Sequence, residues 1–203
     1  MSYDVSLLDP VTKKTLDLPY EHVMTGGTFA ASYDPTTGTF SPMPIREAWL
    51  NITYNYSKYY YEATEGDNRF AHEEITAYYA DGTVGPTEIQ YGLSGLSGKT
   101  GAESIQMLED VIRRIEARYR KDEEWIETER KRTKYYRPDG TEIKDVIHAI
   151  LNNEPYRKKE YTEMISEGPN DDYWEETAAN AISPLYKLIA MAKLRPDGVW
   201  TVE

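Results

Sequence analysis

A tyrosine-rich run at residues 49–61 constrains the fold of this chain more than any other feature. It contains five of the 18 tyrosines and one of the four tryptophans. Read as a β-strand with a period of two, the run has one apolar, aromatic face and one face that is polar but uncharged. The first face holds Leu50, Ile52, Tyr54 and Tyr56, and the second holds Asn51, Thr53 and Asn55. Solvated strand faces usually carry Lys and Glu. The pattern therefore predicts either that the amides bind a specific ligand, or that the strand is buried on both faces with its amides paired to neighbouring backbone.

The composition limits the size and the chemistry of the protein. A chain of 203 residues suffices for one large domain or two small ones, and tyrosine replaces part of the usual aliphatic core. The chain has no cysteine, which excludes disulfides, thiolate chemistry and cysteine-based zinc sites and fits a reducing cytosol. Residues 1–5 alternate like a strand rather than a signal peptide, and no stretch approaches the length of a membrane span. We therefore expect a cytoplasmic protein that does not cross a membrane.

The formal net charge of −12 indicates which partners the protein can have. A nucleic-acid binder normally shows a basic face, so direct binding of nucleic acid is not expected. An acidic protein can instead occupy the basic groove of a nucleic-acid-handling protein. The alternative is an ordinary solvated acidic surface. The acidic side chains that we expect to meet such a partner are Glu73, Glu74, Asp122, Glu123, Glu124, Asp171 and Asp172.

Turn residues divide the first half of the chain into short strands. Asp9-Pro10 predicts a turn that joins residues 1–8 and 14–18 in a hairpin, and Gly26-Gly27 then breaks the pattern. Residues 31–44 read as a loop or a short hairpin. Residues 74–80 and 87–91 read as two strands joined around Asp81-Gly82.

Helical patterns dominate the second half. Thr100 and Glu103 form a capping box, and apolar residues recur with helical spacing from there to about residue 121. The last helix is expected from residue 173 or 177 to residue 194, with Pro184 either kinking it or starting a new helix. Strands are predicted at 125–136, 156–165 and 199–202, a short helix at 144–152, and a tight turn at residues 137–140.

These elements predict an α+β protein. We expect an antiparallel sheet that contains the tyrosine strand, with the two principal helices packed on one face and a charged β/α insertion. The chain reads as a single domain over residues 1–203.

No motif identifies a reaction. Gly98-Lys99-Thr100 resembles the end of a phosphate-binding loop, but such a loop needs glycine at the position of Leu93. A weaker hypothesis is an anion site formed by open backbone amides beside Lys99, the alternative being a flexible loop that leads into a capped helix. A nucleotide or small ligand would then be bound by Asn51, Tyr54, Asn55, Tyr56, Lys99 and Thr100.

Metal chemistry has little support from the sequence. His72-Glu73-Glu74-Ile75-Thr76 begins like a zinc-protease motif, but Thr76 stands where the second histidine is required. Paired acids such as Asp171-Asp172 and Glu175-Glu176 could bind a metal in a hydrolase, although such runs are usually solvated. We expect no cofactor, no resident metal and no catalytic residue.

Four segments together resemble a group of small phage and mobile-element proteins. They are Met24-Thr25-Gly26-Gly27-Thr28, Trp49-Leu50-Asn51-Ile52-Thr53-Tyr54-Asn55-Tyr56, Gly98-Lys99-Thr100-Gly101-Ala102-Glu103-Ser104 and Arg195-Pro196-Asp197-Gly198-Val199-Trp200. The resemblance covers about half of the chain, and its motifs are not catalytic signatures. It implies a common core at residues 1–66, 93–121 and 173–203, with insertions at 67–92 and 125–168. It implies an accessory protein that acts inside a bacterial cell. Such proteins often inhibit host defence, and anti-CRISPR proteins directed at Cas9 are one such class. In this context the acidic charge, the absence of a cofactor motif and the charged insertions favour a non-enzymatic inhibitor that binds the basic groove of a host-defence nucleoprotein. The alternatives are a nucleotide-binding protein and a metal-dependent hydrolase.

Overall fold

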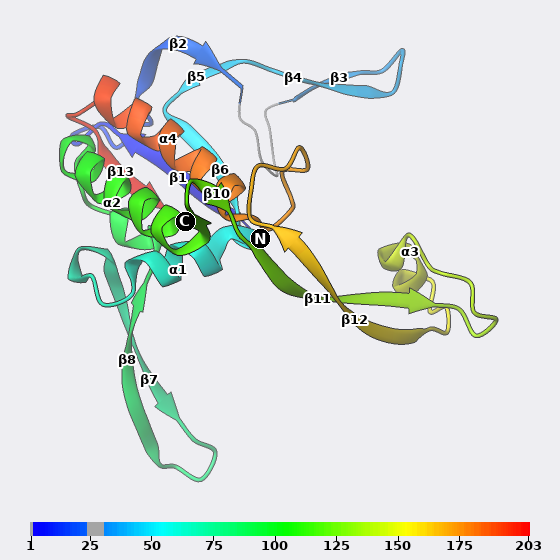
Figure 1. The fold of residues 1–203 in the computed structure, drawn as a ribbon. Helices are drawn as coiled ribbons and strands as arrows, with labels where there is room; N and C mark the ends of the chain where they lie inside the picture. The colour runs from blue at the N-terminus through cyan, green and yellow to red at the C-terminus, as the bar shows by residue number, and fades with distance from the viewer. Residues whose placement is uncertain (1, 24–30) are drawn as a thin grey trace. The chain divides into compact units, whose positions relative to one another are not determined.

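The computed structural model describes residues 2–23 and 31–203, which form an α+β protein (Figure 1). The chain divides into two compact units. The first combines Met1–Glu124 with Gly168–Glu203, and the second is Trp125–Glu167. The second unit covers nearly the same residues as the insertion expected at 125–168.

The first unit holds most of the secondary structure. Its strands are β1 (Ser2–Leu8), β2 (Asp17–His22), β3 (Ala31–Asp34), β4 (Thr39–Pro42), β5 (Ile45–Glu47), β6 (Trp49–Thr53), β7 (Ala71–Tyr78), β8 (Val84–Tyr91), β9 (Arg120–Lys121) and β13 (Val199–Val202). Strand β10 (Glu124–Trp125) pairs with β9 and runs across the boundary between the units. The α-helices of this unit are α1 (Ser57–Thr64), α2 (Gly101–Tyr119) and α4 (Ala178–Leu194), and its 3-10 turns are η1 (Tyr54–Tyr56), η2 (Asn68–Phe70) and η3 (Leu93–Leu96).

A three-stranded antiparallel sheet in the order β13-β1-β6 forms the centre of this unit. Paired residues of an antiparallel sheet share a face, so the inner face is built from residues such as Val5, Leu7 and Leu50, all with no exposed surface. Helices α2 and α4 pack against each other, and α4 also contacts β6 (Figure 1). The indole N–H of Trp200 in β13 donates to the Ser104 hydroxyl of α2 over 2.7 Å. Sheet and helices therefore enclose one apolar core.

Helix α2 begins as its sequence predicts. The Thr100 hydroxyl accepts from the Glu103 amide, and the Glu103 carboxylate accepts from the Thr100 amide over 2.8 Å. The Glu103 carboxylate also accepts from the Thr100 hydroxyl over 2.8 Å. Both bonds to the carboxylate lower the pKa of Glu103, and the bond from the Thr100 amide has the larger effect. The capping box predicted from the sequence is confirmed, and the helix ends at Tyr119, close to the expected residue 121.

The tyrosine run is only partly a strand. Strand β6 ends at Thr53, and the chain then turns through η1 into α1, so the strand predicted for the rest of the run is wrong. A helix places residues three and four apart on one face. The hydroxyls of three tyrosines so spaced donate to carbonyls in and just before α4: Tyr56 to Tyr173, Tyr59 to Glu176 and Tyr60 to Ala181.

Two other predictions need correction or refinement. The turn after Asp9 forms, with its amide donating to the Lys14 carbonyl over 2.8 Å. The predicted hairpin forms next to this turn, where Leu8 bridges Thr15 and the Leu16 amide donates to the Leu7 carbonyl over 2.8 Å. From Asp17 on, strand β2 pairs with β5 instead. Helix α4 runs unbroken through Pro184, so no second helix starts there. The predicted break at Gly26-Gly27 and the motif at residues 24–28 lie outside the described residues.

The hairpin predicted at residues 31–44 forms from β3 and β4, and the strand expected at 199–202 is β13.

The second unit consists of strands β11 (Glu127–Tyr136) and β12 (Arg157–Ser166), an antiparallel pair, and helix α3 (Val146–Leu151). The tight turn predicted after β11 forms, since the Gly140 amide donates to the Arg137 carbonyl over 2.9 Å. In the part of the chain that the structure describes, no helix combines the length and apolar character that crossing a membrane requires.

Candidate functional site

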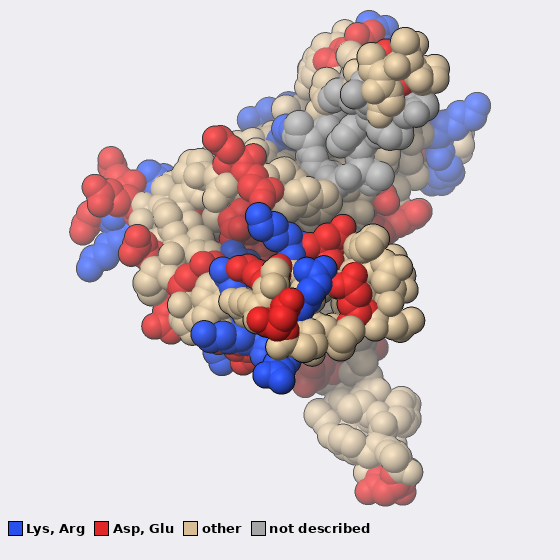
Figure 2. All heavy atoms as spheres, turned by 90° about the vertical axis from the view of Figure 1, so that its right-hand side faces the viewer, with Lys and Arg blue, Asp and Glu red and all other residues tan. Residues whose placement is uncertain are grey.

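The β7–β8 hairpin of the first unit is largely exposed. We call residues 71–91 the acidic arm. They hold four acidic side chains, Glu73, Glu74, Asp81 and Glu88, and no Lys or Arg. Figure 2 shows the arm at the bottom of the view, where red and tan side chains occur without blue. Strands β7 and β8 form a two-stranded sheet of their own. An isolated two-stranded hairpin is at best marginally stable in water, so the arm depends on its base and on whatever covers it.

Both faces of the acidic arm combine carboxylates with apolar side chains. Glu74 pairs with Ile89, and Ile75 pairs with Glu88 on the opposite face. The exposed large apolar residues of the arm are Ile75, Tyr78, Tyr79, Val84 and Ile89, with Tyr78 78% exposed. Within the described residues, none of the four carboxylates of the arm forms an ion pair. The arm therefore presents unpaired negative charge beside apolar anchors.

The tip of the acidic arm is held by its own side chains. The Asp81 carboxylate accepts from the Thr83 hydroxyl over 2.6 Å and from its amide over 3.0 Å, and these bonds lower the pKa of Asp81. Gly85 passes against the Tyr79 ring, since an added Cβ would lie 2.8 Å from the ring. The tip is thus a defined turn, and the Tyr79 ring packs against the backbone at Gly85.

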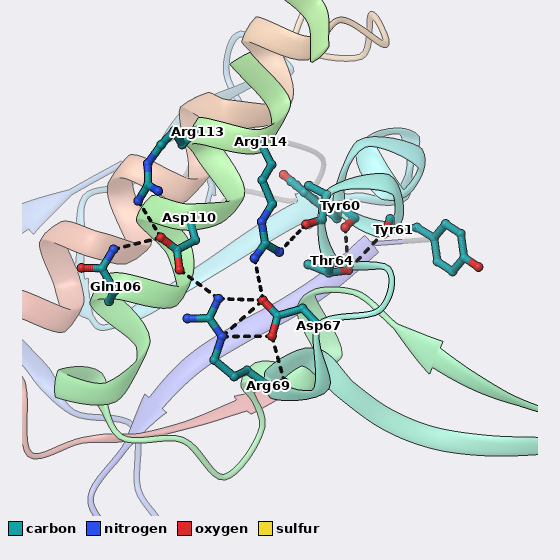
Figure 3. Close-up of polar contacts among 10 residues, drawn as sticks. Tyr60, Tyr61, Thr64, Asp67, Arg69, Gln106, Asp110, Arg113 and Arg114 are labelled. Atoms are coloured by element: carbon teal, nitrogen blue, oxygen red, sulfur yellow. Dashed lines mark hydrogen bonds and ion pairs between the residues drawn. The ribbon is translucent and has the colours of Figure 1, made fainter. Parts of the chain in front are cut away.

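A cluster of ion pairs holds the chain just before the arm against helix α2 (Figure 3). We call Asp67, Arg69, Asp110, Arg113 and Arg114 the ionic base. The Arg69 guanidinium contacts Asp67 over 2.6 Å and Asp110 over 2.9 Å. Arg114 contacts Asp67 over 2.9 Å and donates to the Ala63 carbonyl over 2.8 Å, and Arg113 contacts Asp110 over 2.6 Å. Side chains of η2 and α2 are thereby joined in one network.

Electrostatics within the ionic base favours the charged forms. Hydrogen bonds from the Arg69 side chain, with smaller contributions from its amide and from Arg114, hold the pKa of Asp67 well below its usual range. Burial alone would raise the pKa of Asp110, but hydrogen bonds from Gln106, Arg69 and Arg113 lower it overall. The arginines already have carboxylate partners, so this cluster is a structural brace rather than an anion site.

The same region borders an open depression of about 780 Å³. Its charged lining mixes Glu62 and Glu65 with Arg114 and Arg118, and Arg118 pairs with Glu62 over 3.3 Å. Charges of both signs that satisfy one another give the depression no preference for an anion or a cation.

A close backbone contact holds the acidic arm from its other end. Gly95 lies in η3, just after β8, against the backbone of Phe70, just before β7. A Cβ atom added at Gly95 would lie 2.4 Å from the Cα and the carbonyl oxygen of Phe70. The two ends of the arm are therefore in close contact at a place where only glycine fits.

The structure places the acidic residues predicted for partner binding on three exposed segments. Glu73 and Glu74 lie in the acidic arm, and Asp171 and Asp172 lie in the loop before α4. Asp122 and Glu123 form the β9–β10 turn, and Glu124 begins β10. Asp122 and Glu123 have positive φ angles of 49° and 68°, typical of a tight turn. Among the described residues, no hydrogen bond or ion pair joins one of these segments to another. Only the arm combines its acids with several exposed apolar side chains.

The ligand-binding residues predicted on the tyrosine run are already occupied within the protein. Asn51 is 1% exposed and donates over 2.8 Å both to the Ser2 hydroxyl and to the Asp4 carboxylate. Asn55 donates to the Trp174 carbonyl over 2.9 Å. Tyr54 packs edge-on against Tyr3 at 4.3 Å between ring centroids, and Tyr56 is buried. Asn51 and Thr53 are both buried, as the second interpretation of the strand expects. The Asn55 amide pairs with backbone, while the Asn51 side-chain N–H groups donate to side chains.

The anion site predicted beside Lys99 is closed. The amides of Gly98 and Gly101 donate to the carbonyls of Trp200 and Gly198 over 2.9 and 2.8 Å. The Lys99 amide donates to Leu96, and the side chain of Thr100 is engaged in the capping box. The loop is a packing contact between the start of α2 and β13, so its amides are not free to bind a phosphate.

The described residues contain no group of three or more His, Asp or Glu side chains that could hold a metal ion. Sequence reasoning missed the ionic base. Only the Asp110–Arg113 pair has a local signal, a spacing of three residues in a helix. Arg69 and Asp110 lie 41 positions apart, and no pattern links them.

Comparisons with protein-family models, with curated proteins and with solved structures found no match to this chain. A functional proposal must therefore be argued from the geometry of the acidic arm and the ionic base.

Proposed function

We propose that this chain is a non-enzymatic binding protein that recognises a basic protein surface with its acidic arm. The observation that carries the proposal is the arm itself: four unpaired carboxylates beside five exposed apolar side chains, on a base fixed by ion pairs and by the Gly95 contact. The arm is built to present a surface rather than to enclose a substrate.

The energetics of protein interfaces support this use of the arm. Binding energy at interfaces concentrates in a few anchors, tyrosine prominent among them, that become buried in the complex. Complementary charge adds specificity and speeds association rather than supplying most of the affinity. Tyr78 and Tyr79 are exposed near the tip and can serve as anchors, while Glu73, Glu74 and Glu88 supply the charge. Because ion pairs and the Gly95 contact already order the base, that part of the arm loses little conformational entropy on binding.

The proposed partner is a host-defence nucleoprotein with a basic groove, such as Cas9, in a bacterial cytoplasm. Two observations support this class of partner. The net charge of −12 is opposite to that of a nucleic-acid groove, and the described part of the arm carries no cation that a groove lined by Arg and Lys would repel. The resemblance to small phage and mobile-element proteins points to the same cellular context.

Charge reversal of the arm tests the proposal. The variant E73K/E74K/E88K changes the net charge by the same amount as the control D122K/E123K/E124K, which alters an exposed acidic segment whose apolar neighbours, Trp125 and Ile126, are not among the exposed large apolar residues. Binding of each protein to guide-loaded Cas9 is measured at low and at high salt, together with inhibition of DNA cleavage. We expect the arm variant to bind at least about tenfold more weakly at low salt and the control to remain close to wild type.

A second experiment searches for other nucleoprotein partners. Wild type, arm variant and control serve as baits in a nuclease-treated bacterial lysate, and the captured proteins are compared. Loss of the same captured protein with the arm variant alone supports the proposal. Equal capture by all three baits, or wild-type inhibition by the arm variant, would show that the arm is not the binding surface.

A further inference from the structure

The second unit carries a set of exposed cations without carboxylate partners. In this unit, nine acidic side chains balance nine basic ones. Several cations are paired, such as Arg132 with Glu163 over 2.8 Å and Arg137 with Glu154 over 3.0 Å. Five others are exposed and form no ion pair within the described residues, and we call them the basic set: Lys131, Lys144, Arg157, Lys158 and Lys159.

Apolar side chains are exposed at the end of the unit where Arg157, Lys158 and Lys159 begin β12. Helix α3 buries Ala149 against its own unit but leaves Ile147 74% and Leu151 76% exposed, one helical turn apart. Ile150 is 49% exposed, and Tyr156, which precedes the basic run at the start of β12, is 38% exposed. Figure 1 shows α3 beside the ends of β11 and β12 where Arg157 begins the strand. The unit thus presents an apolar helix face next to unpaired positive charge.

These features mirror those of the acidic arm. The arm offers four unpaired carboxylates and exposed Ile, Val and Tyr side chains. The second unit offers five unpaired cations and exposed Ile, Leu and Tyr side chains. A complementary pair of surfaces on one chain permits a head-to-tail contact between two copies. We propose that the acidic arm of one copy docks on the α3 face and the basic set of a second copy.

Charge distribution favours a protein segment over nucleic acid as the occupant. A polyphosphate requires a continuous cationic path, and carboxylates interrupt the basic set on the same ribbon. Glu160 follows Lys159 directly and pairs across the ladder with Thr133, and Glu163 lies on the face that carries Arg132. The exposed aliphatic residues of α3 also offer nothing to a phosphate backbone. An acidic segment that has its own apolar side chains satisfies both parts of the surface.

This inference rests on the acidic arm as an interaction surface and therefore on the proposed function. It adds a regulatory consequence, because the same arm cannot contact a second copy and an external target at once. At high protein concentration the second unit of another copy would cover the arm. An external partner that binds the arm with higher affinity would compete for it and release single copies by mass action.

Neutral variants of the two surfaces give a decisive test. The arm variant is E73Q/E74Q/E88Q, the face variant is K144Q/K158Q/K159Q, and D122N/E123Q/E124Q is the control for lost charge. All the altered side chains are exposed, and circular dichroism confirms that each variant is folded. Sedimentation velocity over a range of concentrations at low salt measures the mass of each protein and of an equimolar mixture of the arm and face variants.

We expect wild type and control to gain mass with concentration, and each of the two surface variants alone to associate at least about tenfold more weakly. The mixture holds one intact arm and one intact basic set, so it should form a one-to-one dimer and nothing larger. A wild type that stays monomeric, a mixture that forms no dimer, or a variant that associates like wild type would overturn the inference. Tight binding of the monomer to labelled duplex DNA or to phosphatidylserine vesicles, lost in the face variant, would also overturn it. Binding of Cas9 by a monomeric wild type would leave the proposed function standing while removing this contact.

Discussion

Replacing Asp67 with asparagine tests whether the ionic base fixes the acidic arm. The Asp67 carboxylate accepts from the Arg69 Nη2 over 2.6 Å and Nε over 3.0 Å, from the Arg69 amide over 3.1 Å and from Arg114 over 2.9 Å. Asparagine has the same shape, but it has one acceptor oxygen instead of two and no charge. The substitution therefore removes attraction without leaving a cavity.

The size of the effect follows from exposure. The Asp67 side chain is 12% exposed, whereas Arg69 and Arg114 are 41% and 43% exposed. A pair of this kind lies between surface ion pairs, worth below about 1 kcal/mol, and buried ones, whose disruption costs about 3–5 kcal/mol. We expect the free energy of unfolding to fall by about 1–2 kcal/mol, which lowers the melting temperature by about 2–8 °C for a chain of this length.

The dependence on pH gives the result its diagnostic value. The pKa of Asp67 is lower in the folded protein than in the unfolded chain, so its carboxylate stabilises the fold fully above the unfolded pKa, near 4. That contribution is lost as the pH falls through the folded pKa. The difference in stability between wild type and Asp67→Asn should therefore be largest near neutral pH and shrink in acid.

Differential scanning calorimetry at several pH values measures this difference, and hydrogen exchange reports whether amides at the base of the arm open more often. Asp171→Asn removes an exposed carboxylate and is expected to change the stability by less than about 0.5 kcal/mol. A gap between wild type and Asp67→Asn that stays constant with pH would refute the electrostatic reasoning, and the absence of any gap would refute the role of the ionic base.

Three further substitutions test other contacts. Gly95→Ala places a methyl group into the backbone of Phe70 and should cost about 1–3 kcal/mol in urea denaturation; an unchanged midpoint would contradict the close contact. Thr100→Ala removes the cap of α2 and should cost about 1 kcal/mol, with reduced helix signal in circular dichroism, whereas full stability would show that the cap is dispensable. Trp200→Phe breaks the 2.7 Å bond to Ser104, and a double-mutant cycle with Ser104→Ala should give a coupling energy of about 1 kcal/mol; purely additive effects would argue against the bond.

Local sequence patterns predicted the elements that depend on neighbouring residues. The capping box at Thr100 marked the start of α2 because both of its partners lie within three positions. The turn at residues 137–140 and the strands on either side of Asp81-Gly82 were predicted for the same reason, since turn chemistry acts within four residues. The exposure of Glu73 and Glu74 also followed from their charge.

The tyrosine run shows where local patterns fail. Alternation at Leu50, Asn51 and Ile52 identified β6, but the same alternation was read past Thr53, where the chain turns into a helix. The hydroxyls that hold α1 reach carbonyls 117–121 positions away, a separation that no periodicity reports. Tertiary hydrogen bonds, not strand propensity, decided this segment.

The sequence alone thus determined the α+β class, the caps and turns, and the acidic character of the arm, because those depend on residue types and on spacings of a few positions. Only the tertiary structure decided that Asp67, Arg69 and Asp110 meet, that Asn51 is enclosed between Ser2 and Asp4, and that the amides beside Lys99 are taken by β13. Those contacts join residues that are distant in the chain, and they form only when burial of the common core brings their elements together.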